Sequence, residues 1–196
     1  MSLYHDIVEA LMPLIQACNH LSIEYYIGGS VSSSVHGLPR RTQDVDVIVN
    51  IQSNHVHPLT QLLQQEYYFD EQALEDAVQH SLPYNLIHLN TMMKVDLIPL
   101  KQRAFTKEEA RRAQTQELEI GMLPVRIASA EDAILTKLEW FHMGGQSSSR
   151  QWNDILGIVM RQGMKLDLTY LRQWANALSV GNLLEQALLD AERKSS

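Results

Sequence analysis

Three aspartates in the middle of the chain are the residues whose types and spacing could do chemistry. Asp44 and Asp46 lie one residue apart in an apolar run, and Asp96 stands in a second apolar run with Lys94. Because side chains alternate along a strand, Asp44 and Asp46 are expected on the same face. Like charges on one face favour a cation between them, and Mg²⁺ or Mn²⁺ prefers oxygen ligands of this kind. The pattern therefore indicates a site for metal-assisted phosphoryl transfer.

Each of these aspartates also has an ordinary structural interpretation. An isolated Asp-x-Asp is as often a solvated strand end, and Asp96 could be a core aspartate satisfied by a partner. In two-metal phosphoryl transfer, one ion activates the attacking oxygen while the other steadies the triphosphate and the departing pyrophosphate. The chemistry needs all three carboxylates, so the fold must bring Asp96 alongside the Asp pair.

A glycine turn precedes the aspartates. Gly28, Gly29 and Ser30 follow a short run of β-forming residues. Glycines let the backbone approach a ligand closely, and amides at the start of a helix can bind phosphate. A Gly-Gly pair is more often only a turn, so this feature gains weight from its place before Asp44.

Hydrophobic periodicity predicts the elements that must position these residues. Strands are predicted at residues 23–27, 45–49, 86–89 and 95–98, with a hairpin turn at Asn90-Thr91 and two short strands between 117 and 127. Helices are predicted at 7–21, between Gly29 and Pro39, at 57–67, from Thr106, from Ser129, and in two or three segments after residue 150. Ser129 is the expected N-cap, with Asp132 completing a variant capping box. The order indicates an α+β catalytic domain with a helical C-terminal part.

Composition limits the partners. The chain of 196 residues has a formal net charge of −7, so a whole-chain basic footprint for nucleic acid is absent. Polyanion binding would need local clusters such as Arg40 with Arg41, or Arg111 with Arg112. The single cysteine, Cys18, cannot form a disulfide within the chain. Neither a signal peptide nor a spanning segment is readable, so a cytoplasmic protein without a membrane partner is expected.

The order of these motifs resembles the nucleotidyltransferase superfamily related to polymerase β. The resemblance is closest to small prokaryotic toxins of AbiE and MenT type and their uncharacterised relatives. The matching first half reads Ile27-Gly28-Gly29-Ser30, then Pro39-Arg40-Arg41-Thr42-Gln43-Asp44-Val45-Asp46, then Asp96. The suggestive second half reads Ser129-Ala130-Glu131-Asp132, then Lys137, Arg150 and Asp154. The resemblance covers about residues 7 to 160.

The resemblance implies a small mixed β-sheet core flanked by helices over residues 1–127, with a helical region at 128–196 packed on it. It implies that Asp44 and Asp46 bind both metals, and that Asp96 holds the catalytic metal and acts as general base. The nucleotide would be bound by Gly28, Gly29, Ser30, Arg40, Thr42, Lys137, Arg150 and Asp154.

Within that set the resemblance gives several residues particular roles. Lys137 would face the triphosphate as a point charge. Arg40 would contact phosphate or brace the Asp-x-Asp strand, and Asp154 would orient Lys137 or Arg150. The alternative, purely structural interpretations are a surface lysine on a helix for Lys137 and an i, i+4 ion pair between Arg150 and Asp154.

The expected reaction is transfer of a nucleoside monophosphate from an NTP to a hydroxyl acceptor, with release of pyrophosphate. An RNA end such as that of tRNA, a protein or a small molecule could be the acceptor, and an antitoxin could be a partner. The alternative hypothesis is a catalytically silent module that binds nucleotide or protein, as a component of a toxin–antitoxin system.

Overall fold

The computed structural model describes residues 5–118 and 124–195. Its strands are β1 (Tyr25–Ile27), β2 (Asp44–Val49), β3 (Tyr67–Tyr68), β4 (Tyr84–His88), β5 (Lys94–Pro99), β6 (Gln114–Gln116) and β7 (Val125–Ile127). Its helices are α1 (His5–His20), α2 (Gly29–His36), α3 (Ser53–Leu63), α4 (Glu71–Gln79), α5 (Ala104–Arg112), α6 (Ala130–Met143), α7 (Ser149–Gln162), the 3₁₀ helix η1 (Gly163–Lys165), α8 (Leu168–Ala177) and α9 (Gly181–Ser195). The mixed strand-and-helix content confirms the predicted α+β class.

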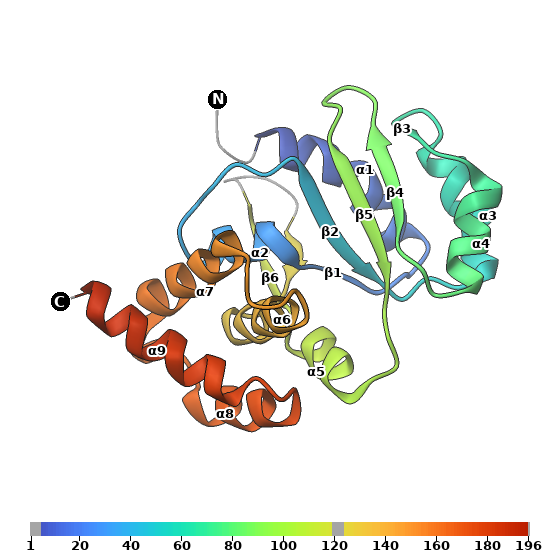
Figure 1. The fold of residues 1–196 in the computed structure, drawn as a ribbon. Coiled ribbons are helices and arrows are strands. Elements are labelled where there is room, and N and C mark those ends of the chain that lie inside the picture. Colours follow the sequence, from blue (N-terminus) through green and yellow to red (C-terminus); the bar gives the residue numbers. More distant parts are fainter. Residues whose placement is uncertain (1–4, 119–123, 196) are drawn as a thin grey trace. The chain divides into compact units, whose positions relative to one another are not determined.

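The chain divides into two compact units. The first comprises Met1–Gly28 and Arg41–Ile127 and carries every described strand together with α1, α3, α4 and α5 (Figure 1). The second comprises Gly29–Arg40 and Ala128–Ser196 and is helical. The short helix α2 thus groups with the C-terminal helices, although it precedes the Asp-x-Asp strand in the sequence.

The sheet of the first unit has the strand order β3-β4-β5-β2-β1-β7-β6. Strand β2 lies between β1, which is antiparallel to it, and β5, which is parallel. Along β2 the valines are buried, whereas Asp44, Asp46 and Ile48 are only half-buried. One sheet face is therefore packed with apolar side chains, and the other face presents the carboxylates.

Several predicted elements match the structure. The predicted strands at 86–89 and 95–98 are the antiparallel pair β4 and β5, joined by a turn that includes Asn90. The helix predicted from Ser129 is α6, and the Ser129 hydroxyl caps it by accepting a hydrogen bond from the Asp132 amide. The side chain of Asp132 accepts from the Ser129 hydroxyl at 2.6 Å, so the two residues do form a reciprocal pair.

The region after β2 differs from the prediction. The helix expected at 57–67 is instead α3, which begins at Ser53, where the Gln52 amide donates to the His55 ring at 3.2 Å, and ends at Leu63. Tyr67, which was expected in that helix, lies in strand β3. Helix α4 was not predicted, although its signals are local: Asp70 caps it by accepting a hydrogen bond from the Ala73 amide, and Leu74 and Ala77 lie on its one buried side. Of the two short strands expected between 117 and 127, β7 lies in that stretch at Val125–Ile127, whereas its antiparallel partner β6 lies before it at Gln114–Gln116. Residues 119–123 of that stretch lie outside the described residues.

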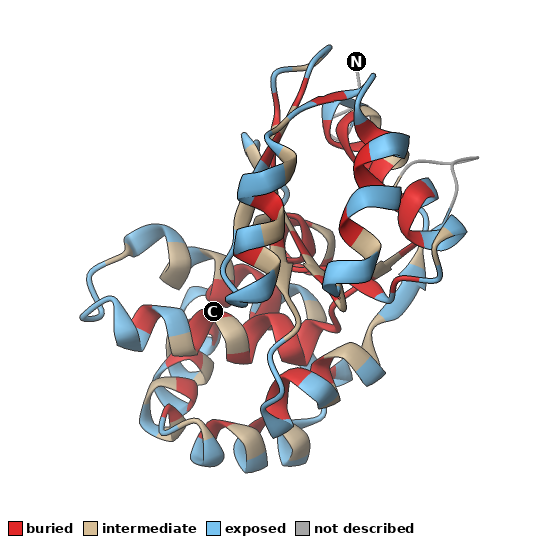
Figure 2. Ribbon diagram, turned by 90° about the vertical axis from the view of Figure 1, so that its right-hand side faces the viewer, coloured by how far each residue is buried: buried red, intermediate tan, exposed pale blue. Residues whose placement is uncertain are grey.

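Burial follows the helical and strand periodicities (Figure 2). Helices are buried along one side and exposed along the other, as amphipathic elements on a core should be. Within the described ranges, no helix combines the length and apolarity needed to cross a membrane.

The Tyr67 hydroxyl hydrogen-bonds to two backbone groups of α1 on either side of a proline. Pro13 lies inside α1 and has no amide hydrogen to donate. The buried Tyr67 hydroxyl donates to the Ala10 carbonyl at 2.6 Å and accepts from the Leu14 amide at 3.3 Å. An unbroken helix would pair these two backbone groups with each other. The hydroxyl therefore keeps α1 continuous where it packs against the sheet edge.

Replacement of Tyr67 by Phe is expected to lower the free energy of unfolding by about 1–3 kcal/mol, because two buried backbone groups lose their partner. Denaturant unfolding measures this change. The matched control is Tyr68→Phe, which removes a hydroxyl from a residue that is 72% exposed and should leave stability unchanged. Equal effects of the two substitutions would contradict this role of the buried hydroxyl.

Candidate active site

The register of β2 and β5 brings the third aspartate to the Asp pair. Asp46 is the Cα partner of Asp96, and Asp44 is the partner of Lys94. Paired residues on adjacent strands point to the same face, so the three carboxylates share the half-buried face of the sheet. The prediction that the fold places Asp96 alongside Asp44 and Asp46 is met by the backbone.

Local hydrogen bonds fix the Asp-x-Asp strand and the turn beside it. The Thr42 hydroxyl donates to the Asp44 carboxylate at 2.7 Å and contacts the Asp44 carbonyl at 3.1 Å. The Gly28 amide donates to the Asp46 carbonyl at 3.0 Å. A Cβ on Gly28 would come within 2.8 Å of the Ile48 Cδ1 atom, so glycine allows this close approach.

Lys94 supplies a cation to the carboxylate face. Its ammonium lies 2.8 Å from Asp96 Oδ2. The hydrogen bond to Asp96 raises the pKa of Lys94. Burial opposes this change, and the charges of Asp96, Asp44 and Asp46 act in the same direction as the hydrogen bond. Three carboxylates on one face favour cations beside them, and the Lys94 ammonium is one such cation.

The other oxygen of Asp96 has no hydrogen-bond partner in the described part of the chain. Oδ1 is buried and accepts no hydrogen bond from any described residue. A buried acceptor left unsatisfied is costly, and such groups in native proteins often mark the place of an ion or ligand. Hard oxygen donors with one unused buried lone-pair site fit Mg²⁺ or Mn²⁺. As the side chains stand, no group of three or more His, Cys, Asp or Glu among the described residues converges as a metal-binding cluster.

A second charged cluster lies within the helical unit and centres on Asp154. Arg40 donates to both carboxylate oxygens of Asp154, from Nε at 2.9 Å and from Nη2 at 3.0 Å. The Lys137 ammonium lies 2.9 Å from Asp154 Oδ2. Arg40 Nη2 also donates to the Ser30 hydroxyl at 2.6 Å. One carboxylate therefore holds two cations, and one of these, Arg40, also holds the Ser30 hydroxyl near the start of α2.

Close contact between α2 and α7 makes this cluster possible. A Cβ on Gly37 would come within 2.8 Å of the Ile158 amide nitrogen, and one on Gly157 within 3.2 Å of the Leu38 amide nitrogen. Both glycines lie three residues from a member of the ion pair, Gly37 before Arg40 and Gly157 after Asp154. The missing side chains let the backbones approach, and Arg40 then reaches Asp154 directly.

The structure contradicts the two purely structural interpretations given above for Lys137 and for the Arg150–Asp154 pair. Lys137 is buried, with 11% of its side chain exposed, so it is not a surface lysine. Asp154 pairs with Arg40 and Lys137 rather than with Arg150 as an i, i+4 pair. Arg150 is exposed and has no ion pair with any residue that the structure describes. Arg40 braces Asp154 and Ser30, and nucleotide binding by these residues stays a prediction.

Two geometric features of the sites were not predicted. Lys94 lies two residues before Asp96, so its place on the same strand face could be read from the sequence, but its pairing with the carboxylate could not. The Arg40–Asp154 pair joins residues 114 positions apart. No local pattern signals such a contact, and only the packing of α2 on α7 reveals it.

Comparison with solved structures defines the class of fold. The chain has the fold of nucleotidyltransferase-like proteins. An antigenic nucleotidyltransferase-like protein from Paracoccidioides brasiliensis aligns with a TM-score of 0.54 and 19% identity, covering 93% of this chain and 91% of that chain. ANT(2″)-Ia in complex with adenylyl-2″-tobramycin aligns with a TM-score of 0.52 and 14% identity, covering 88% and 96%. No protein-family model and no curated protein matches the chain.

The Asp154 carboxylate is held in its charged form. Burial alone would raise the pKa of Asp154, but hydrogen bonds from Arg40 and Lys137 and the charges of both lower it below the ordinary value of 3.8. A carboxylate with a lowered folded-state pKa stabilises the protein above its unfolded pKa. That contribution is lost as the pH falls through the folded-state pKa.

Replacement of Asp154 by Asn should lower the free energy of unfolding by about 3 kcal/mol near neutral pH, because two cations lose their buried partner. The deficit relative to wild type should shrink as the pH falls below the ordinary carboxyl range. Chemical denaturation across pH measures both effects.

The matched control is Glu185→Gln, which breaks the exposed Arg172–Glu185 pair, whose side chains are 53% and 51% exposed. This control should unfold like wild type, since surface pairs contribute little. A deficit for Asp154→Asn that does not depend on pH would contradict the assignment of its effect to charge.

Proposed function

We propose that this chain is a nucleotidyltransferase, which moves a nucleoside monophosphate from an NTP to a hydroxyl acceptor and releases pyrophosphate. The observation that carries the proposal is the register of Asp46 with Asp96 on the half-buried face of a nucleotidyltransferase-fold sheet. The unpartnered Asp96 Oδ1 supports it, because a buried acceptor of this kind suits a ligand.

Asp44, Asp46 and Asp96 would hold Mg²⁺ or Mn²⁺. Bound divalent ions of this kind supply Lewis-acid stabilisation to the phosphates and to the attacking and leaving oxygens. Thr42 supports the set by fixing the orientation of the Asp44 carboxylate. Lys94 limits the repulsion among the carboxylates when fewer cations are bound.

In the proposed transfer, one bond forms, one bond breaks and one proton moves. The acceptor oxygen forms a bond to the α-phosphorus, and the bond from that phosphorus to the bridging oxygen of the pyrophosphate breaks. Pyrophosphate leaves with the electron pair of the broken bond. The proton of the acceptor hydroxyl passes to the Asp96 carboxylate, which acts as general base.

The cluster around Asp154 is proposed to bind the triphosphate. Ser30, Arg40 and Lys137 offer hydroxyl, guanidinium and ammonium donors, and these suit phosphate oxygens. Gly29 opens α2 with a φ of 52°, a conformation that favours glycine and leaves the helix amides approachable. Gly28, Thr42 and Arg150 complete the proposed nucleotide-binding set, and Asp154 orients the two cations. Residues 1–127 are proposed as the catalytic core and 128–196 as its helical region.

The acceptor class and the biological partner are also proposals. The crystal structure of ANT(2″)-Ia in complex with adenylyl-2″-tobramycin supports small hydroxylated molecules as one acceptor class, beside RNA ends and proteins. The likeness of the motifs to AbiE- and MenT-type toxins supports an antitoxin as a partner. A nucleotide-binding module without turnover is the second candidate, and the Lys94–Asp96 ion pair favours it by supplying a resident cation.

Metal-dependent binding of one NTP is the expected outcome for the wild-type protein. An NTP at about 100 times its Kd should raise the unfolding free energy by roughly 2.7 kcal/mol, a shift in the unfolding midpoint of about 5–10 °C. Thermal unfolding with each of the four NTPs, with and without Mg²⁺ or Mn²⁺, measures the shift. Asp46→Asn should abolish the metal-dependent part, because one carboxylate ligand is lost.

The control for this experiment is Asp76→Asn, a substitution at an exposed aspartate of α4 that should keep the full shift. A shift of equal size without metal, retained in Asp46→Asn, would favour the binding module over the enzyme. No shift with any NTP at millimolar concentration would overturn the proposed function.

A further inference from the structure

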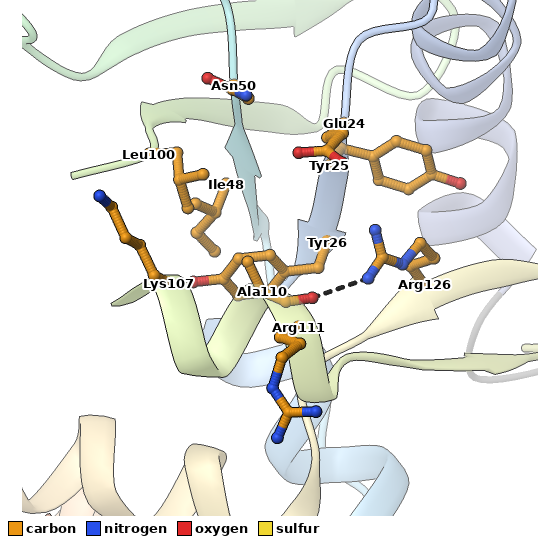
Figure 3. Close-up of a pocket in the computed structure, with 10 residues that line it drawn as sticks. All are labelled: Glu24, Tyr25, Tyr26, Ile48, Asn50, Leu100, Lys107, Ala110, Arg111 and Arg126. Atoms are coloured by element: carbon orange, nitrogen blue, oxygen red, sulfur yellow. Dashed lines mark hydrogen bonds between the residues drawn. The ribbon is translucent and has the colours of Figure 1, made fainter. Parts of the chain in front are cut away.

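A pocket opens on the first unit beside the carboxylate face (Figure 3). It has a volume of about 280 Å³, at the small end of ligand sites. Its walls come from the start of β1, the end of β2, the residue after β5, helix α5 and strand β7. The lining residues are Glu24, Tyr25, Tyr26, Ile48, Asn50, Leu100, Lys107, Ala110, Arg111 and Arg126.

The pocket lies on the same sheet face as the aspartates. Ile48 follows Asp46 by two residues on β2, so their side chains point the same way and their Cα atoms lie about 7 Å apart. Tyr26 is the Cα partner of Ile48, which places it on that face as well. Ile48 also lies close to the Gly28 turn. A molecule in the pocket would therefore extend along the face toward Asp46 and Asp96.

Cationic side chains outnumber carboxylates among the residues that line the pocket. Lys107, Arg111 and Arg126 line it with Glu24, but the Arg111 side chain points away from the other labelled side chains (Figure 3). Arg126 donates to the Ala110 carbonyl at 2.7 Å, and Arg111 is engaged with Glu108 at 2.6 Å. Lys107 is exposed and has no ion pair with any described residue, so its ammonium can meet a ligand. Figure 3 shows its side chain on the side of the pocket that holds Leu100 and Ile48.

We propose that this pocket binds the acceptor, and that the acceptor is a hydroxylated molecule carrying a phosphate group. The inference rests on the proposed function and narrows its substrate class. Ile48 and Leu100 would contact the carbon skeleton, Lys107 would pair with the phosphate, and the acceptor hydroxyl would face the aspartates. Lysine and arginine suit a phosphate, whereas a polycationic aminoglycoside such as tobramycin would be repelled. A free sugar phosphate or the end of an RNA could supply this chemistry.

The test compares ligand binding to wild type, Lys107→Glu and Lys107→Gln by isothermal titration calorimetry. The probes are ribose 5-phosphate, uncharged ribose, tobramycin and a short single-stranded RNA. Wild type should bind ribose 5-phosphate at least about tenfold more tightly than ribose. Lys107→Glu should bind ribose 5-phosphate about tenfold more weakly than wild type does. Lys107→Gln, which removes the charge without reversing it, should lose less.

The matched control is Lys101→Glu, a charge reversal at an exposed lysine near α5 that does not line the pocket. It should bind ribose 5-phosphate like wild type. An RNA that binds more tightly than ribose 5-phosphate and depends on Lys107 would identify an RNA end as the source. An RNA that binds no more tightly would identify a free phosphate ester.

Affinity for ribose 5-phosphate that is absent, or equal in wild type and Lys107→Glu, would overturn the proposal, as would tighter binding of tobramycin. Mg²⁺–NTP binding is measured on the same proteins. Wild type and the Lys101→Glu control should bind the NTP equally. A failure of NTP binding in wild type therefore counts against the proposed function and not against the pocket.

Discussion

Like charges held in register on one sheet face are the constraint on which the candidate site depends. The parallel pairing of β2 with β5 puts Asp46 opposite Asp96, and it can be maintained because the intervening valines are buried on the other face. A slip of one residue would move the apolar set outward and the carboxylates inward. Burial of the valines thus stabilises a strand register that repulsion between the carboxylates alone would disfavour.

In the helical unit, the charged cluster has more cations than carboxylates, the opposite of the carboxylate face of the sheet. Around Asp154 two cations share one carboxylate in a mostly buried setting, so the desolvation of each is offset only while the set is complete. Replacing such a cluster by apolar side chains is often neutral or stabilising, so stability alone does not explain its presence. The glycines at the α2–α7 contact are the local condition for the cluster, because they admit the backbone approach that Arg40 needs.

The sequence predicts those features that depend on local periodicity. The shared face of Asp44 and Asp46, the β4–β5 hairpin and the Ser129 cap all follow from spacing within a few residues. The alignment of Asp96 with Asp46 could be predicted only from the resemblance or seen in the fold, because the order of strands in a sheet does not follow from local sequence patterns. The Arg40–Asp154 pair and the α5 wall of the pocket depend on packing between distant segments. Helix α4 was missed although the Asp70 cap and its single apolar side, with Leu74 and Ala77, are local features of the sequence.

The central claim is that Asp46 and Asp96 are ligands of one divalent-metal site. Crystals grown with Mn²⁺ and a non-hydrolysable NTP analogue test it most directly, because the anomalous signal of manganese locates the ion without interpretation of the surrounding density. The account predicts a manganese peak bonded to carboxylate oxygens of both aspartates, with Asp96 Oδ1 now partnered. A manganese peak elsewhere, with the Lys94–Asp96 pair intact and Asp96 Oδ1 still without a partner, would contradict it.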